Sequence, residues 1–190
     1  MSYTKYFFLL ITLLSGCTQL PQTRTPDYKP HISKKDISNF NMGVASLGAN
    51  DTNKAASIFN NLISDNPEIS GPWVNLGIIH YNNNQYQQSR IAASNALKLN
   101  PGNPYALNLS GMLARRNGNI KQAHSFYLKA IEYKKDYAIA HYNIALLYDI
   151  YFQDVRTAAR HYRIYLDLID GNDKQTTDWL EQIQNSMKKS

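Results

Sequence analysis

The sequence lacks the residue patterns that most enzyme and metal sites require. It has a single cysteine, Cys17, which excludes an intramolecular disulfide and a cysteine-rich metal site. The histidines include no pair at the i, i+4 spacing of a helical zinc site: His31, His80, His124, His141 and His161. A phosphate-binding glycine loop and a serine in a nucleophile-elbow context are missing as well. We therefore expect no enzymatic activity, no cofactor and no metal.

A concentration of charge of one sign is also missing. The chain has 20 Lys and Arg against 14 Asp and Glu, a net charge of +6, but the basic residues are spread out and interleaved with acids. A nucleic-acid-binding surface usually shows a basic stripe or patch. We therefore expect diffuse surface charge and no nucleic-acid partner. The 43% hydrophobic content is enough for one domain with a buried core.

The most apolar segment, residues 6–14, is too short for a permanent transmembrane helix, which needs about 20 apolar residues. It follows Lys5 and has the length of a signal-peptide core. Leu14-Ser15-Gly16-Cys17 resembles the bacterial lipobox. The resemblance implies that residues 1–16 are a signal peptide, cleaved before Cys17, and that Cys17 receives acyl chains. The alternative is an ordinary signal peptide with an incidental cysteine.

Residues 17–35 are expected to be the acylated cysteine and a flexible tether. Proline recurs among polar residues, with no hydrophobic periodicity, which favours an extended chain. At ~3 Å per residue the tether reaches on the order of 50 Å. An ordered arm packed on the domain is the alternative. In enteric-type lipoproteins an aspartate after the cysteine retains the protein at the inner membrane, so Thr18 implies an outer-membrane protein facing the periplasm.

A small residue recurs at a fixed period in the rest of the chain. Gly43, Gly77 and Gly111 are evenly spaced, and Ala145 takes the next place in the series. Such a period indicates one supersecondary unit used four times. The frames are 36–69, 70–103, 104–137 and 138–171.

The second frame carries the clearest motif. Its Trp73, Leu76, Gly77, Ala96 and Pro101 stand at positions that define a tetratricopeptide repeat (TPR), a unit whose length equals the glycine spacing. The other frames match in part, and the fourth gains one residue. The chain therefore resembles the TPR family. The resemblance implies an all-α fold, a right-handed superhelical array of four TPR helix pairs plus a C-terminal capping helix.

The large side chain expected between neighbouring repeats differs in one frame. Phe59, Tyr127 and Tyr162 take this place in the first, third and fourth frames, whereas the second has Ala93. We expect that interface to be thinner or filled by a neighbour, such as Tyr86.

Residues 172–190 are expected to form the capping helix. Gly171-Asn172-Asp173 can stop one helix and cap the next. Trp179, Leu180, Ile183 and Met187 then share one face of the new helix. A free amphipathic helix for membranes or partners is the alternative.

The resemblance also implies a concave groove, lined by the first helix of each pair, that binds a protein or an extended peptide. Asparagine recurs at one groove position, and Leu109 breaks that series. An asparagine there can hydrogen-bond a peptide backbone with both donor and acceptor. The candidate groove residues are Asn41, Asn75, Tyr81, Arg115, Arg116, Tyr142, Asn143 and Asp149. Local bonding, packing between helices and charge at a helix end are the alternative roles.

Architecture suggests the cellular role. A lipid-anchored TPR array is similar to the TPR lipoproteins of bacterial pilus and secretion machines, including type IV pilus biogenesis and tight-adherence pilus lipoproteins. The similarity implies a periplasmic adaptor, held in the outer membrane, that supports assembly of such a machine. The alternative is a TPR lipoprotein that recruits or regulates peptidoglycan synthases or hydrolases.

Overall fold

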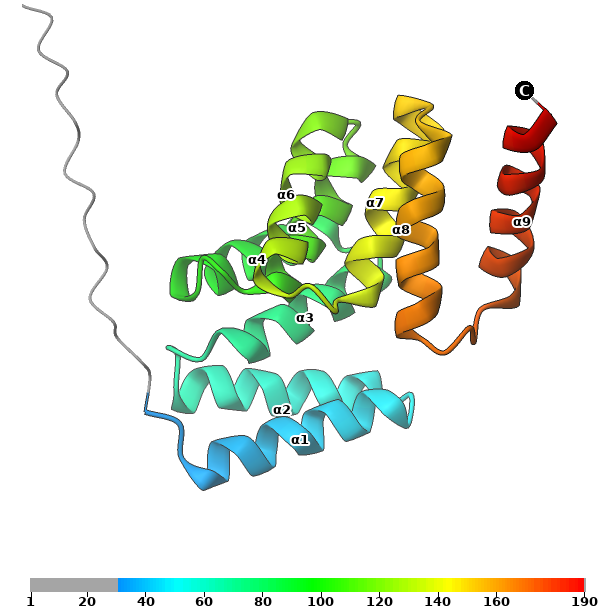
Figure 1. Ribbon diagram of the computed structural model, residues 1–190. Helices are drawn as coiled ribbons and strands as arrows, with labels where there is room; N and C mark the ends of the chain where they lie inside the picture. The colour runs from blue at the N-terminus through cyan, green and yellow to red at the C-terminus, as the bar shows by residue number, and fades with distance from the viewer. Residues whose placement is uncertain (1–30, 190) are drawn as a thin grey trace, which may run out of the picture.

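A computed structural model describes residues 31–189, in which all regular secondary structure is helical (Figure 1). The helices in this range are α1 Lys34–Gly48, α2 Thr52–Asp65, α3 Ser70–Asn82, α4 Tyr86–Leu99, α5 Pro104–Arg116, α6 Ile120–Tyr133, α7 Ala138–Leu147, the π-helix η1 Tyr148–Phe152, α8 Val155–Leu168 and α9 Lys174–Lys189. None of them is long and apolar enough to cross a membrane. The predicted all-α class is confirmed.

Consecutive helices pack against one another along the whole array. The pairs are α1 with α2, α3 with α4, α5 with α6, and α7 with α8, and α9 follows alone (Figure 1). In addition α3 contacts α5, so these two first helices of neighbouring pairs lie side by side. This is a TPR-type helical repeat array. The handedness of its superhelix stays a prediction.

Polar side chains start several helices. The Ser33 hydroxyl accepts a hydrogen bond from the Asp36 amide at 3.1 Å, and the Asp36 carboxylate accepts one from the Ser33 amide at 2.9 Å, a capping box. Asn103 accepts bonds from two amides of α5, which begins with Pro104. These caps satisfy backbone donors that lack partners within the helix.

The turns inside the pairs share one backbone feature. Each contains a residue in the left-handed region: Asn50, Asn84, Gly118 and Gln153, with φ between 55° and 76°. The first three are evenly spaced along the chain, and the last interval is longer by a single residue. The π-helix η1 accounts for the added residue, because a π turn contains one more residue than an α turn.

Glycine lets large rings pack inside two of the pairs. A Cβ added at Gly43 would lie 2.7 Å from the Phe59 ring, and one at Gly111 would overlap the Tyr127 ring. Both rings are fully buried. In the second pair Ala93 is too small to fill this space, and a Cβ added at Gly77 would instead lie 2.6 Å from Leu109.

A neighbour fills part of the space left by the missing ring, as expected, but the side chain beside Gly77 is Leu109. Leu109 of α5 fills the space beside Gly77, whereas Tyr86 lies partly buried at the edge of the same cluster. Leu109 reaches the site from the next helix pair. This contact also gives a physical reason for the break in the asparagine series at residue 109.

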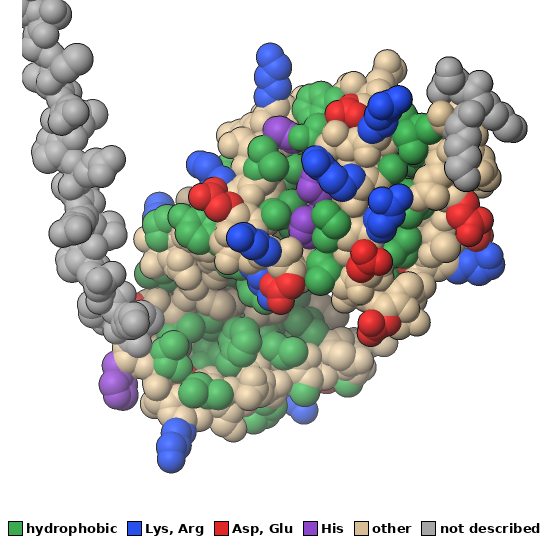
Figure 2. Space-filling view, in the orientation of Figure 1, with side chains coloured by type: hydrophobic (Ala, Val, Ile, Leu, Met, Phe, Trp, Pro, Cys, Tyr) green, Lys and Arg blue, Asp and Glu red, His purple; other side chains and the backbone are tan. Residues whose placement is uncertain are grey.

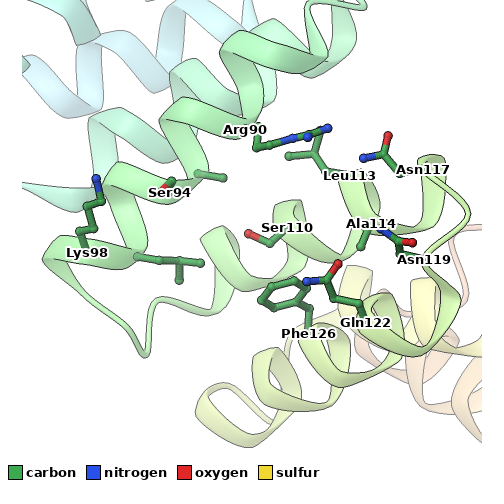
Figure 3. A pocket seen from close by; sticks show the side chains of 12 residues that line it. Arg90, Ser94, Lys98, Ser110, Leu113, Ala114, Asn117, Asn119, Gln122 and Phe126 are labelled. Atoms are coloured by element: carbon green, nitrogen blue, oxygen red, sulfur yellow. The ribbon is translucent and has the colours of Figure 1, made fainter.

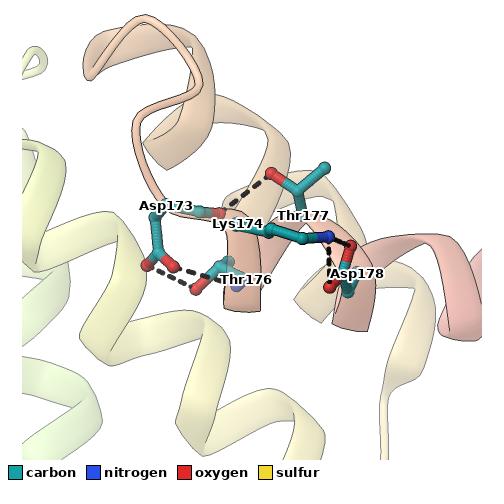
Figure 4. A network of polar contacts seen from close by, with 5 residues as sticks. All are labelled: Asp173, Lys174, Thr176, Thr177 and Asp178. Atoms are coloured by element: carbon teal, nitrogen blue, oxygen red, sulfur yellow. Dashed lines mark hydrogen bonds and ion pairs between the residues drawn. The ribbon is translucent and has the colours of Figure 1, made fainter.

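The last helix is capped and packed rather than free. The Asp173 carboxylate accepts bonds from the Thr176 amide at 3.0 Å and the Thr176 hydroxyl at 2.7 Å (Figure 4). It also accepts a bond from the Tyr165 hydroxyl at 3.0 Å. Leu180 and Ile183 of α9 are buried in a cluster with α7 and α8. The start of α9 is thus tied to α8.

Candidate interaction face

The predicted asparagines have different environments. The Asn75 side chain donates to the Gly71 carbonyl at 3.1 Å, a bond within α3. Asn143 is only 5% exposed, and its side-chain Nδ2 donates to the side-chain Oδ1 of Asn108 at 3.0 Å, a contact between α7 and α5. Asn41 is exposed on α1. The array therefore uses two of these amides for its own hydrogen bonds.

The predicted tyrosines pack against neighbouring rings. Tyr81 meets Tyr86 edge to face, with ring centroids 5.5 Å apart. Tyr142 lies between Tyr162 and Tyr165 of α8, at centroid distances of 6.0 and 5.0 Å. Both predicted residues are half-buried. Their position fits the packing role more closely than a free recognition role.

The predicted charged residues also have internal contacts. The Arg116 guanidinium carbon lies 3.6 Å from the centroid of the Tyr86 ring, a cation–π contact. Arg115 lies beside Tyr127, whose pKa is raised chiefly by burial. The Asp149 carboxylate accepts a bond from the Tyr162 hydroxyl at 3.3 Å, and burial followed by the Asp149 charge raises the pKa of that hydroxyl.

The first helices expose a row of large apolar side chains instead. Ile37, Tyr105 and Ile139 stand at one repeat position and are 51%, 43% and 46% exposed. Val44 and Ile78 stand at a second repeat position and are 44% and 36% exposed. We call these five residues the first-helix face. The sequence analysis did not predict them. Their spacing, equal to the repeat period or twice that period, could have indicated them.

Exposed apolar residues at equivalent positions of successive helices form an ordered surface rather than scattered exceptions. Apolar surface usually faces a helix partner, and exposed patches commonly mark interaction sites. A cavity of about 220 Å³ opens at one end of the face, where α1 and α3 meet, lined by Ile37, Phe40, Ile69 and Gly71 among others. Figure 2 shows hydrophobic side chains gathered over the part of the molecule that contains α1 to α3, beside a hollow.

The fold brings together two histidines that lie on different helices, α7 and α8. Nδ1 of His141 lies 3.0 Å from Nδ1 of His161, and Nε2 of His141 lies 3.0 Å from the Lys135 carbonyl oxygen. Because a carbonyl only accepts, His141 carries its proton on Nε2 and accepts at Nδ1 from His161. Burial, with the charges of His141, Arg160 and His124, lowers the pKa of His161 to about 4. The contact between the two rings joins α7 to α8.

Residues 31–189 contain no group of three or more side chains suited to hold a metal ion. Cys17, the predicted signal peptide of residues 1–16 and most of the predicted tether lie outside the described residues. Lipid attachment at Cys17 thus stays a prediction.

Two family models described as tetratricopeptide repeat match the chain, over residues 71–103 and 104–137. Among solved structures, Pseudomonas aeruginosa PilF has a TM-score of 0.68 at 14% identity, covering 81% of this chain and 69% of its own. MamA of Desulfovibrio magneticus RS-1 has a TM-score of 0.60 at 18% identity, covering 83% and 88%. No curated protein matches the sequence.

A third similar structure was solved with a ligand. It is the first TPR domain of Spaghetti (RPAP3) bound to an HSP90 peptide, with a TM-score of 0.55 at 17% identity, covering 62% of this chain and 92% of its own. At such identities these likenesses show a shared fold, which in that protein holds a peptide.

Proposed function

Because this chain is a TPR-repeat protein, we propose that it is an adaptor that binds an extended segment of a partner protein along the first-helix face. The observation that carries the proposal is the placement of Ile37, Val44, Ile78, Tyr105 and Ile139 at repeated positions, each exposed. TPR scaffolds are generally non-enzymatic interaction modules, and the similar domain solved with an HSP90 peptide supports a peptide ligand.

The geometry of the face suggests a pattern in the ligand. Packed helices lie about 8–10 Å apart. A chain in polyproline II conformation rises about 3.1 Å per residue and has three residues per turn, so every third side chain points the same way at about 9 Å intervals. We expect a partner segment with apolar residues at every third position, one for each first helix.

The polar groups of this surface limit the ligand contacts further. Asn75 and Asn143 already donate to the Gly71 carbonyl and the Asn108 side chain. Of the three asparagines, Asn41 is the exposed one, so we expect it to be the most available to a peptide backbone. Apolar contact supplies most of the affinity, at roughly 25 cal/mol for each Å² of apolar surface removed from water.

The cellular setting belongs to the same proposal. Acylation of Cys17 anchors the protein in the outer membrane, and the residues between Cys17 and the Ser33 cap of α1 hold the array in the periplasm, where it supports assembly of an envelope machine such as a pilus or secretion system. The lipobox-like segment before Cys17 and the likeness to TPR lipoproteins support this setting. A single acyl chain binds a membrane only weakly, and two or more give stable attachment.

The binding face is tested by crosslinking and co-purification of the full chain from cells. The double variant Ile78→Asp with Ile139→Asp places charge on the face. Ile91→Asp with Leu128→Asp is the matched control, because these residues are exposed on second helices, at 52% and 44%. We expect a pilus or secretin subunit to be enriched with wild type and control and lost with the face variant. Equal recovery with all three proteins would contradict the proposed face.

The identity of the recovered partner tests the cellular role separately. Recovery of peptidoglycan synthases or hydrolases alone would reject the envelope machine and favour the cell-wall alternative. The anchor is tested by Cys17→Ser, which we expect to abolish palmitate labelling and to move the protein out of the outer-membrane fraction. Unchanged labelling in this variant would reject acylation at Cys17.

A further inference from the structure

A second hollow lies between α4 and α6, with α5 as its floor (Figure 3). Its volume is about 520 Å³. It uses the side of α5 that carries Ser110, Leu113, Ala114 and Asn117. Tyr105, of the first-helix face, stands on another side of α5, since successive residues advance about 100° around a helix. We call this hollow the second-helix hollow.

The hollow exists because this junction between helix pairs has smaller side chains than its neighbours. Ala93 stands where the adjacent junctions have the rings of Phe59 and Tyr127. Ser110 stands where they have Leu76 and Ile144, and Ala114 where they have the rings of His80 and Tyr148. Leu109 fills only the part of the missing volume beside Gly77. The remaining space opens to the surface.

The chemistry of the lining is asymmetric. The deepest part is apolar and buried, formed by Ala93 of α4 with Leu113 and Ala114 of α5, which are between 2% and 6% exposed. One rim carries Arg90 and Lys98, both exposed on α4. The opposite rim, from α6, is neutral, and no Asp or Glu lines the hollow. Neither cation forms an ion pair within residues 31–189.

We propose that the second-helix hollow binds a segment of a partner protein that carries carboxylates beside an apolar side chain. The apolar side chain enters the hollow over Ala93 and Ala114, and the carboxylates pair with Arg90 and Lys98. These two residues are eight positions apart on α4, about 12 Å along the helix. Acidic residues about four positions apart on an extended segment match that distance, since a strand rises about 3.3 Å per residue.

This site is independent of the first-helix face.

Arg90 suits a carboxylate ligand, because its planar guanidinium holds a carboxylate through two parallel hydrogen bonds. Charge at an exposed rim is screened by salt, so binding should weaken as ionic strength rises. The array would then hold two partners, or two segments of one partner, on different sides of α5.

The test uses the immobilised full chain and a phage-displayed library of random dodecapeptides. We expect selected peptides to share acidic residues flanking an apolar one. Arg90→Glu with Lys98→Glu should weaken their binding at least tenfold, and Ser110→Leu, which matches Leu76 and Ile144, should weaken it through loss of space. The charge-matched control is Lys129→Glu with Arg163→Glu, on exposed sites of α6 and α8.

Two results would overturn the proposal. One is a set of selected peptides without an acidic consensus. The other is equal binding of the peptides to wild type, to the Arg90 and Lys98 variant and to its control. Ile78→Asp with Ile139→Asp separates the two sites, because it should leave the acidic peptides bound. Loss of binding only in that variant would reject the second-helix hollow and leave the first-helix face standing.

Discussion

Leu109 of α5 lies against Gly77 of α3, in the kind of space that a ring of the same helix pair fills beside Gly43 and Gly111. Leu109 is 1% exposed, and Ala93, the residue that replaces the ring, is 2% exposed. One large side chain has thus been exchanged for another that comes from the next pair. This exchange joins the second and third pairs through the core.

We expect Leu109→Ala to destabilise the array by about 2–5 kcal/mol, because it leaves a cavity with no side chain able to fill it. Ala93→Phe alone should also destabilise, because its ring competes with Leu109 for the same space. In the double variant the ring occupies the vacated space, so part of the loss should be recovered. Urea unfolding of the four proteins measures this coupling. Strictly additive effects would show that the two residues do not share one space.

Gly111→Ala should destabilise the third pair by about 1–3 kcal/mol, because the added methyl group overlaps the buried Tyr127 ring. Gly48→Ala is the control, since no heavy atom of the fold lies within 4 Å of a Cβ placed there. That change should be neutral or slightly stabilising, because alanine is the better helix former. Thermal unfolding of both variants checks the prediction, and equal effects would contradict it.

Asp173→Ala should cost about 0.5–2 kcal/mol, the usual range for loss of a helix N-cap. It also removes the acceptor for the Tyr165 hydroxyl that ties α9 to α8. Asp178→Ala is the control, since its partner Lys174 is exposed and the ion pair lies in solvent. Amide hydrogen exchange in α9 is the measurement. Exchange should accelerate in the Asp173 variant and stay near wild type in the control.

Acid should weaken the contact between α7 and α8 through His161. Its pKa of about 4 in the fold is below the ordinary value of 6.5. The unfolded chain therefore binds the proton first, and the stability contributed by the neutral ring is lost as the pH falls from about 6.5 to about 4. The melting temperature of His161→Gln should fall less over this range than that of wild type. His31→Gln, at an exposed site, serves as control, and parallel curves for all three would contradict the role of His161.

Much of the fold was predictable from local pattern. Three evenly spaced glycines indicated the repeated unit, because a close helix crossing requires a small residue at the same place each time. Asp173 was recognisable as the start of the last helix, because an N-cap depends on residues only a few positions away. Such signals lie within one helix or turn, where the order of residues determines the contacts.

The candidate site was less predictable. The eight predicted groove residues were placed by analogy, and contacts such as that between Asn143 and Asn108 come from packing between helix pairs. The exposed apolar residues from Ile37 to Ile139 recur with the period of the repeat, but buried apolar residues would show the same sequence pattern. Exposure depends on whether a neighbouring helix covers a side chain, which periodicity does not specify.

The sequence by itself determined the all-α repeat architecture, the start of the last helix and the lipobox-like segment that ends at Cys17. Only the tertiary structure decided that Leu109 takes the place of a missing ring, that His141 meets His161, and that a hollow opens above Ala93. The physical reason is that each of these features joins residues from different helices. The distances between these residues depend on how the side chains of different helices pack together. The spacing of residues along the chain indicates only the repeated unit.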